Sequence, residues 1–135
     1  MDETSEGFLR YPTDRIVAVI DEPDQVAIAV ARLSEAGFDG EEVRVLCGEE
    51  GAQRLDASGE RHGLLARLTR ILQNFGEEDT HAERHAAELR AGHYVVGVHV
   101  GEDEDRKAAA HLALKDADAH FVHYYGDWTI EQLEP

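Results

Sequence analysis

Eight histidines in a chain of 135 residues are the first feature that could carry chemistry. An imidazole with an unperturbed pKa of about 6.5 can transfer a proton or bind a metal ion at physiological pH. Two of the eight, His120 and His123, lie in the ring-rich stretch HFVHYYGDW. The first question is whether these rings form a site or belong to one strand of a sheet.

Alternation predicts which rings share a face. Every second side chain in residues 93–100 is apolar, and the same period returns in residues 120–125. Successive side chains of a strand point to opposite faces, so one face should pack under helices while the other carries the rings. The candidates on the second face for contact with a ligand or a partner, together with the tryptophan that follows the strand, are His93, His99, His123, Tyr125 and Trp128.

An apolar sheet face edged by rings is seldom left to water. Three coverings stay open, namely a second copy of the chain, an added segment of the same chain, or a small planar ligand such as haem. Any haem would be held non-covalently, because the sequence has no CxxCH motif. Two strand spacings separate His99 from His123 by about 10 Å, which is too far for both to bind one zinc ion. A dimer interface or a cover from the same chain is favoured over a ligand pocket.

A second set of histidines could bind a divalent metal ion. His81 and His85 are four positions apart on a predicted helix, and Glu88 follows one turn later, so the three side chains can share a face. The metalloprotease motif needs a glutamate directly after its first histidine, where this chain has Ala82. Histidines at this spacing also occur on exposed alanine-rich helices, so a metal site and a solvated helix face both stay open.

Nucleophilic catalysis has little support in the sequence. Cys47 is the only cysteine, which excludes a disulfide within the chain and any cysteine-based zinc or iron–sulfur site. The serines lie outside a nucleophile-elbow context, and the glycines lack the spacing that cradles phosphate. The sequence therefore requires no cofactor, leaves the identity of any cofactor unknown, and favours a function other than catalysis.

The charge of the chain excludes some partners. With 29 acidic and 13 basic residues its formal net charge is -16, so its surface should repel the phosphates of nucleic acid and of anionic membranes. The first residues show no basic region followed by a long apolar run. We therefore expect a cytoplasmic protein that binds neither nucleic acid nor membrane.

Two strand–helix–strand units must position these side chains. The first runs from Ile16 to Gly48 and the second from Tyr94 to Gly126. Between them, a leucine stripe predicts an amphipathic helix over residues 62–75, and a further helix is expected over residues 79–92.

Two such units most economically form an α+β fold, the ferredoxin-like βαβ-βαβ sandwich. Its four-stranded antiparallel sheet has the first and third strands in the middle and two helices on one face, and a two-helix insertion falls at about residues 49–92. We expect one such domain over residues 15–135, after a flexible segment at residues 1–14.

Three long segments resemble a known family. RIVAVIDEPDQVAIAVARLSEAGFDGEEVRVLCG, ELRAGHYVVGVHV and HFVHYYGDWTIEQL resemble bacterial general stress, or heat-induced stress, protein domains, and the resemblance covers nearly the whole chain after its first dozen residues. The most similar motifs, SEAGFDGEEVRVL and VHYYGDW, are not catalytic signatures. The resemblance implies a stress-linked, ferredoxin-like protein of undefined activity. Where related proteins often have a glycine-rich apolar middle, this chain has the leucine-striped segment at 62–75, which argues against a membrane role.

Three functions follow as hypotheses. We favour a non-enzymatic cytoplasmic stress-response protein that acts through self-association, as a homodimer, or through binding of a partner. The first alternative is a module that binds a small molecule or haem on the histidine-lined sheet face. The second alternative is a small ferredoxin-like enzyme of the monooxygenase type.

Overall fold

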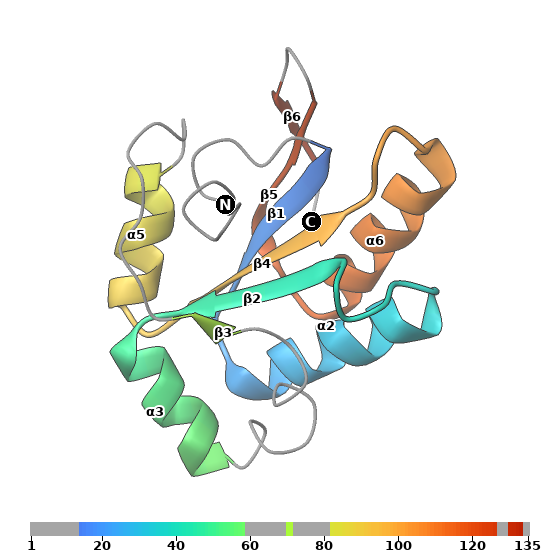
Figure 1. Cartoon of the computed structure of the whole chain (residues 1–135). Helices are drawn as coiled ribbons and strands as arrows, with labels where there is room; N and C mark the ends of the chain where they lie inside the picture. Colours follow the sequence, from blue (N-terminus) through green and yellow to red (C-terminus); the bar gives the residue numbers. More distant parts are fainter. Residues whose placement is uncertain (1–13, 59–69, 72–81, 127–129, 134–135) are drawn as a thin grey trace.

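The computed structural model describes residues 14–58, 70–71, 82–126 and 130–133. Within these residues a single sheet has six strands in the order β3-β2-β4-β1-β5-β6 (Figure 1). The strands are β1 (Arg15–Ile20), β2 (Val43–Cys47), β3 (Arg70–Ile71), β4 (Tyr94–His99), β5 (His120–Tyr125) and β6 (Ile130–Gln132). The helices are α2 (Pro23–Glu35), α3 (Glu49–Ser58), α5 (Ala82–Arg90) and α6 (Glu104–Asp116).

The structure confirms the predicted α+β class but not the predicted extent of the sheet. β1 and β4 lie in the middle, as expected, and the pairs β2–β4, β4–β1 and β1–β5 are antiparallel. The expectation of four strands is wrong. β3 adds a parallel strand beside β2, and β6 pairs with β5 because the chain reverses after Tyr125.

One face of the sheet is covered by α2 and α6. β1 is apolar and largely β-branched on both faces, and its even-numbered side chains pack in the core beneath these two helices. α2 begins at Pro23 and ends before Gly37, whose φ of 100° is one that few residues with a Cβ adopt. Asp103 caps α6 by accepting hydrogen bonds from two backbone N–H groups of its first turn.

α5 packs on the opposite face of the sheet, where it meets β4 and the Phe121 ring of β5. The buried apolar cluster on this side, which we call the second core, consists of Val17, Val19, Leu46, Leu89, Val95 and Tyr125. α5 contributes Leu89 to it, and Figure 1 shows α5 on the left of the sheet and α6 on the right. A segment of the same chain, one of the three coverings that the sequence left open, therefore lies over part of this face, and a second copy and a ligand stay predictions.

The insertion between β2 and β4 differs from its prediction. The helix expected over residues 62–75 does not run through Arg70 and Ile71, which form β3 beside β2, and the rest of that range lies outside the described residues. The polar segment before it forms α3. The helix expected over residues 79–92 is confirmed from Ala82 to Arg90.

Candidate functional site

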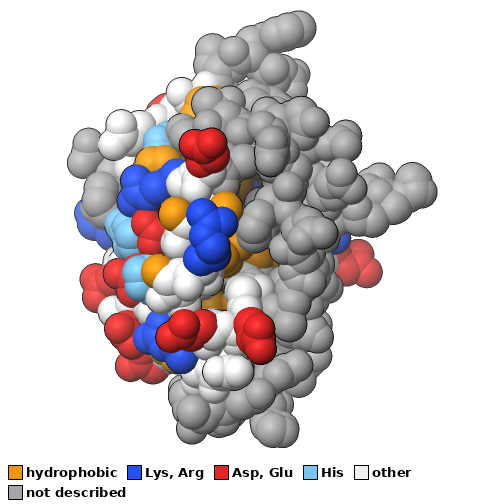
Figure 2. All heavy atoms as spheres, turned by 90° about the vertical axis from the view of Figure 1, so that its left-hand side faces the viewer, with side chains coloured by type: hydrophobic (Ala, Val, Ile, Leu, Met, Phe, Trp, Pro, Cys, Tyr) orange, Lys and Arg blue, Asp and Glu red, His pale blue; other side chains and the backbone are white. Residues whose placement is uncertain are grey.

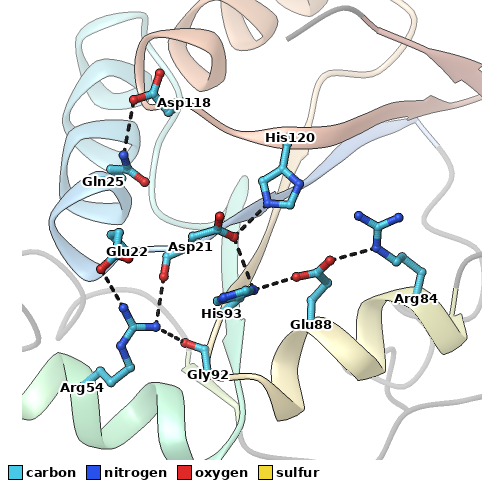
Figure 3. Close-up of polar contacts among 10 residues, drawn as sticks. All are labelled: Asp21, Glu22, Gln25, Arg54, Arg84, Glu88, Gly92, His93, Asp118 and His120. Carbon is cyan, nitrogen blue, oxygen red and sulfur yellow. Dashed lines mark hydrogen bonds and ion pairs between the residues drawn. The ribbon is translucent and has the colours of Figure 1, made fainter.

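Four side chains meet at the end of the sheet where β1 stops and where β4 and β5 start (Figure 3). Asp21 follows the last residue of β1, and His120 is the first residue of β5. Glu88 lies in the last turn of α5, and His93 lies in the turn that joins α5 to β4. We call these four residues the carboxylate–imidazole cluster.

Each carboxylate of the cluster contacts an imidazole. His120 Nε2 lies 2.8 Å from Asp21 Oδ1, and His93 Nδ1 lies 3.3 Å from the same oxygen. His93 Nδ1 is also 2.7 Å from Glu88 Oε1. One ligand atom from each of Asp21, Glu88 and His120 lies within 4.8 Å of the other two. These three groups are therefore close enough to bind one ion together, and His93 lies beside two of them.

A β-bulge in β5 brings His120 into the cluster. His123 pairs with Val17 and His120 pairs with Val19, so β5 has one more residue than β1 over this stretch. Phe121, inside the bulge, has a φ of 53°, which a bulky residue rarely adopts. The extra residue turns His120 onto the face of His123, whereas strict alternation would put it on the other face.

Arg54 of α3 connects the two backbone segments that carry Asp21 and His93. Its guanidinium donates hydrogen bonds to the carbonyl oxygens of Asp21 at 3.0 Å and of Gly92 at 2.6 Å. It also forms an ion pair of 2.7 Å with Glu22 (Figure 3). Because partners of this kind hold ligands in place, Arg54 is a positioning residue for the cluster.

Gly92 makes the turn that returns the chain from α5 to the cluster. Its φ is 90°, and a Cβ at this position would lie 3.3 Å from Glu50 Cγ. In the same turn the backbone N–H of His93 donates to the carbonyl oxygen of Glu88 at 2.9 Å. The turn therefore sets the His93 imidazole beside the Glu88 carboxylate.

The cluster is anionic and can be reached from solvent. Burial raises the pKa of Glu88, but hydrogen bonds from His93 and Arg84 outweigh this effect and leave the pKa below its usual value. The Glu88 side chain is 14% exposed, whereas that of Asp21 is 43% exposed. Figure 2, viewed from the α5 side, shows histidine, acidic and basic side chains gathered next to one another.

One imidazole nitrogen, of His120, and two carboxylate oxygens, of Asp21 and Glu88, form a ligand set that suits divalent first-row transition metal ions. Ligands bound to a tetrahedral zinc ion at about 2.0 to 2.2 Å lie roughly 3.3 Å from one another. The Asp21–His120 contact of 2.8 Å is near that spacing, and the Glu88 ligand atom lies within 4.8 Å of both, so side-chain shifts would admit an ion. Without an ion, the same atoms make hydrogen bonds in which an imidazole N–H donates to a carboxylate.

The predicted metal set shares Glu88 with the cluster. His85 is buried in a different contact, where its ring meets that of Phe121 edge-on with centroids 5.8 Å apart. His81 lies outside the described residues. The set of His81, His85 and Glu88 therefore stays a prediction.

The predicted sheet-face residues do not gather at one place. His93 joins the cluster, whereas His99 lies at the other end of β4. His123 and Tyr125 are buried in a row of rings along β5, with their centroids 6.5 Å apart, and burial lowers the pKa of His123. Trp128 lies outside the described residues.

Sequence reasoning missed Asp21 and His120, because their proximity depends on the register between β1 and β5. The signal that could have identified them is their position relative to the predicted strands. Each stands at the end of a predicted strand, and the ends of antiparallel neighbours meet at one edge of a sheet.

No family model, curated protein or solved structure matches this chain. None of the helices that the structure describes has the length and apolarity needed to cross a lipid bilayer. The resemblance to stress proteins therefore stays a prediction, and the functional argument rests on the geometry of the cluster.

Proposed function

We propose that this chain is a metal-binding protein that holds a divalent first-row transition metal ion in the carboxylate–imidazole cluster. The observation that carries the proposal is the convergence of ligand atoms, with one atom each of Asp21, Glu88 and His120 mutually within 4.8 Å. His93 Nδ1 contacts both carboxylates and orients them beside His120. Zn²⁺ is the first ion to test, because it accepts imidazole and carboxylate ligands together in a tetrahedral site.

Charge favours an ion over a hydrogen-bonded network alone. Arg84 already forms an ion pair of 2.8 Å with Glu88, and a doubly charged cation would add the charge that neutralises the Asp21 carboxylate as well. The formal net charge of -16 attracts cations towards the whole surface. The exposure of Asp21 leaves a route by which an ion can enter the cluster.

The fold that presents this site is, in the same proposal, ferredoxin-like. The strands β2, β4, β1 and β5 are neighbours in that order with antiparallel pairing, and α2 and α6 cover one face. Two βαβ units are expected to form this arrangement. β3, β6, α3 and α5 are then additions to it.

Isothermal titration calorimetry with Zn²⁺, on the full chain after treatment with a chelator, tests the metal-binding proposal. We expect the unaltered chain to bind the ion and the His120→Gln variant to bind it at least about tenfold more weakly. His111→Gln is the matched control, because it removes an imidazole from α6 on the other side of the sheet. No binding by the unaltered chain, or equal affinity in His120→Gln and the control, would overturn the proposal.

A role in binding is in line with the non-catalytic function that the sequence favours. Self-association and the link to stress stay predictions. The sheet face on which a dimer, a haem or a substrate was expected is filled by the second core, where Val17 is 1% and Tyr125 0% exposed. Light scattering of the chromatographed protein at micromolar concentration tests self-association, and a strict monomer would count against it.

A further inference from the structure

The carboxylate–imidazole cluster draws its ligands from the two sides of one contact between a helix and the sheet. Glu88 and His93 belong to α5 and the turn that follows it, whereas Asp21 and His120 belong to the ends of β1 and β5. An ion bound by Asp21, Glu88 and His120 would therefore connect α5 to the sheet.

α5 has few apolar contacts of its own with the rest of the molecule. Among its residues with described side chains, the buried apolar ones are Ala86 and Leu89, and His85 is buried beside them. The guanidinium of Arg84 adds a contact of 4.1 Å with the Phe121 ring. An element with so little buried apolar surface is expected to open at a lower free energy than the core strands.

When no ion is bound, the polar contacts of the cluster add little stability to the packing of α5 on the sheet. Glu88–His93 lies within the α5 side, and His120–Asp21 lies within the sheet side. The contact between His93 and Asp21 crosses the boundary, and at 3.3 Å it is the longest of the three. A metal ion would replace this one weak connection by bonds to ligands on both sides.

We infer that the ion acts as a clamp that holds α5 over the second core, so that loss of the ion releases the helix. This inference rests on the proposed metal-binding function. An ion that binds the closed arrangement and not the open one favours the closed arrangement by a factor of one plus the ratio of free ion to Kd. Release of α5 would expose the apolar side chains that Leu89 covers, so the ion regulates access to that surface.

Hydrogen exchange measured by mass spectrometry on the full chain tests the clamp, with calorimetry on the same samples. At a free Zn²⁺ concentration of about 100 times Kd, the amides of residues 82–92 should exchange about 100-fold more slowly than without the ion. The amides of α6 serve as the internal reference. We expect exchange at the α6 amides to slow much less, because opening of α5 leaves α6 in place.

A variant separates the clamp from a direct effect on α5. His120→Gln removes a ligand on the sheet side without changing any residue of α5, so at the same Zn²⁺ concentration exchange in residues 82–92 should be slowed by about tenfold or less. Binding in the calorimeter with no slowing at α5, or with slowing that only equals that of α6, would overturn the clamp and leave the metal-binding proposal standing. Absence of binding would overturn the metal-binding proposal and the clamp with it.

Discussion

The position of His120 depends on the backbone of its neighbour Phe121, whose φ is 53°. That conformation inserts the extra residue of the bulge and turns the His120 imidazole towards Asp21. Strained residues of this kind persist where the surrounding structure holds them in place. Here Phe121 is held by its contacts with His123 and Arg84. A single backbone conformation therefore decides which histidine belongs to the site.

Gly92 offers a test at the scale of one residue. Gly92→Ala should lower the free energy of unfolding by about 1 to 2 kcal/mol, because an L-residue is strained in the left-handed region. It should also weaken Zn²⁺ binding, since a shift of the strained turn would move the Gly92 carbonyl oxygen to which Arg54 donates. Chemical denaturation and calorimetry measure the two effects.

Gly101→Ala is the matched control for that substitution. Gly101 also has a positive φ, of 68°, but a Cβ there meets nothing within 4 Å. It should show a similar loss of stability with unchanged affinity for Zn²⁺. If both variants lost affinity equally, the contact between Gly92 and Arg54 would not be what positions the ligands.

His123 should make the ion-free protein less stable as the pH falls. Burial, His85 and Arg84 all lower the pKa of His123, and a hydrogen bond to the Phe121 carbonyl only partly offsets them. The unfolded chain therefore binds more protons below the unperturbed pKa of about 6.5, so the free energy of unfolding decreases from pH 7.5 towards pH 5.5. His123→Gln should reduce this slope in denaturation experiments with chelator present, and an unchanged slope would contradict the assignment.

At the scale of elements, α3 reaches the site through one side chain. Arg54 donates from Nη1 to the carbonyl oxygens of Asp21 and Gly92 and from Nη2 to Glu22, and lysine, with one nitrogen, cannot reproduce this two-nitrogen arrangement. Arg54→Lys should therefore weaken Zn²⁺ binding by about tenfold. Arg32→Lys is the control, because Arg32 forms half-exposed ion pairs on α2. Equal affinities of the two variants in calorimetry would remove Arg54 from the site.

The elements also show what sequence patterns could predict. The apolar runs and alternation of β1, β2, β4 and β5 identify strands because these signals come from burial on the two faces of a sheet. The leucine stripe at 62–75 predicted a helix through Ile71, yet Ile71 pairs with Leu46 at the sheet edge, a contact between segments that local periodicity cannot contain. Glu88 and His93 were predicted because local helix and strand spacing picks them out. Asp21 and His120 were not, because they meet only through the pairing of β1 with β5.

At the scale of the whole molecule, the negative net charge should raise the affinity for the ion. A formal charge of -16 raises the concentration of cations near the surface, and added salt screens this field over a Debye length of about 10 Å at 0.1 M. We predict that the Kd for Zn²⁺ rises several-fold between about 0.02 and 0.2 M sodium chloride. A Kd that stays constant over this range would show that only the local ligands determine affinity.

The distribution of the ligands along the chain has a consequence for the order of events in biosynthesis. Asp21 and His120 are separated by 99 positions, and the two repeated units must both be in place before their side chains can meet. A nascent chain that has not yet released β5 from the ribosome therefore lacks a complete site, however well its first half has folded. Uptake of the ion would mark the moment at which β5 has left the ribosome, and products truncated before it would be distinguished by their failure to retain the ion.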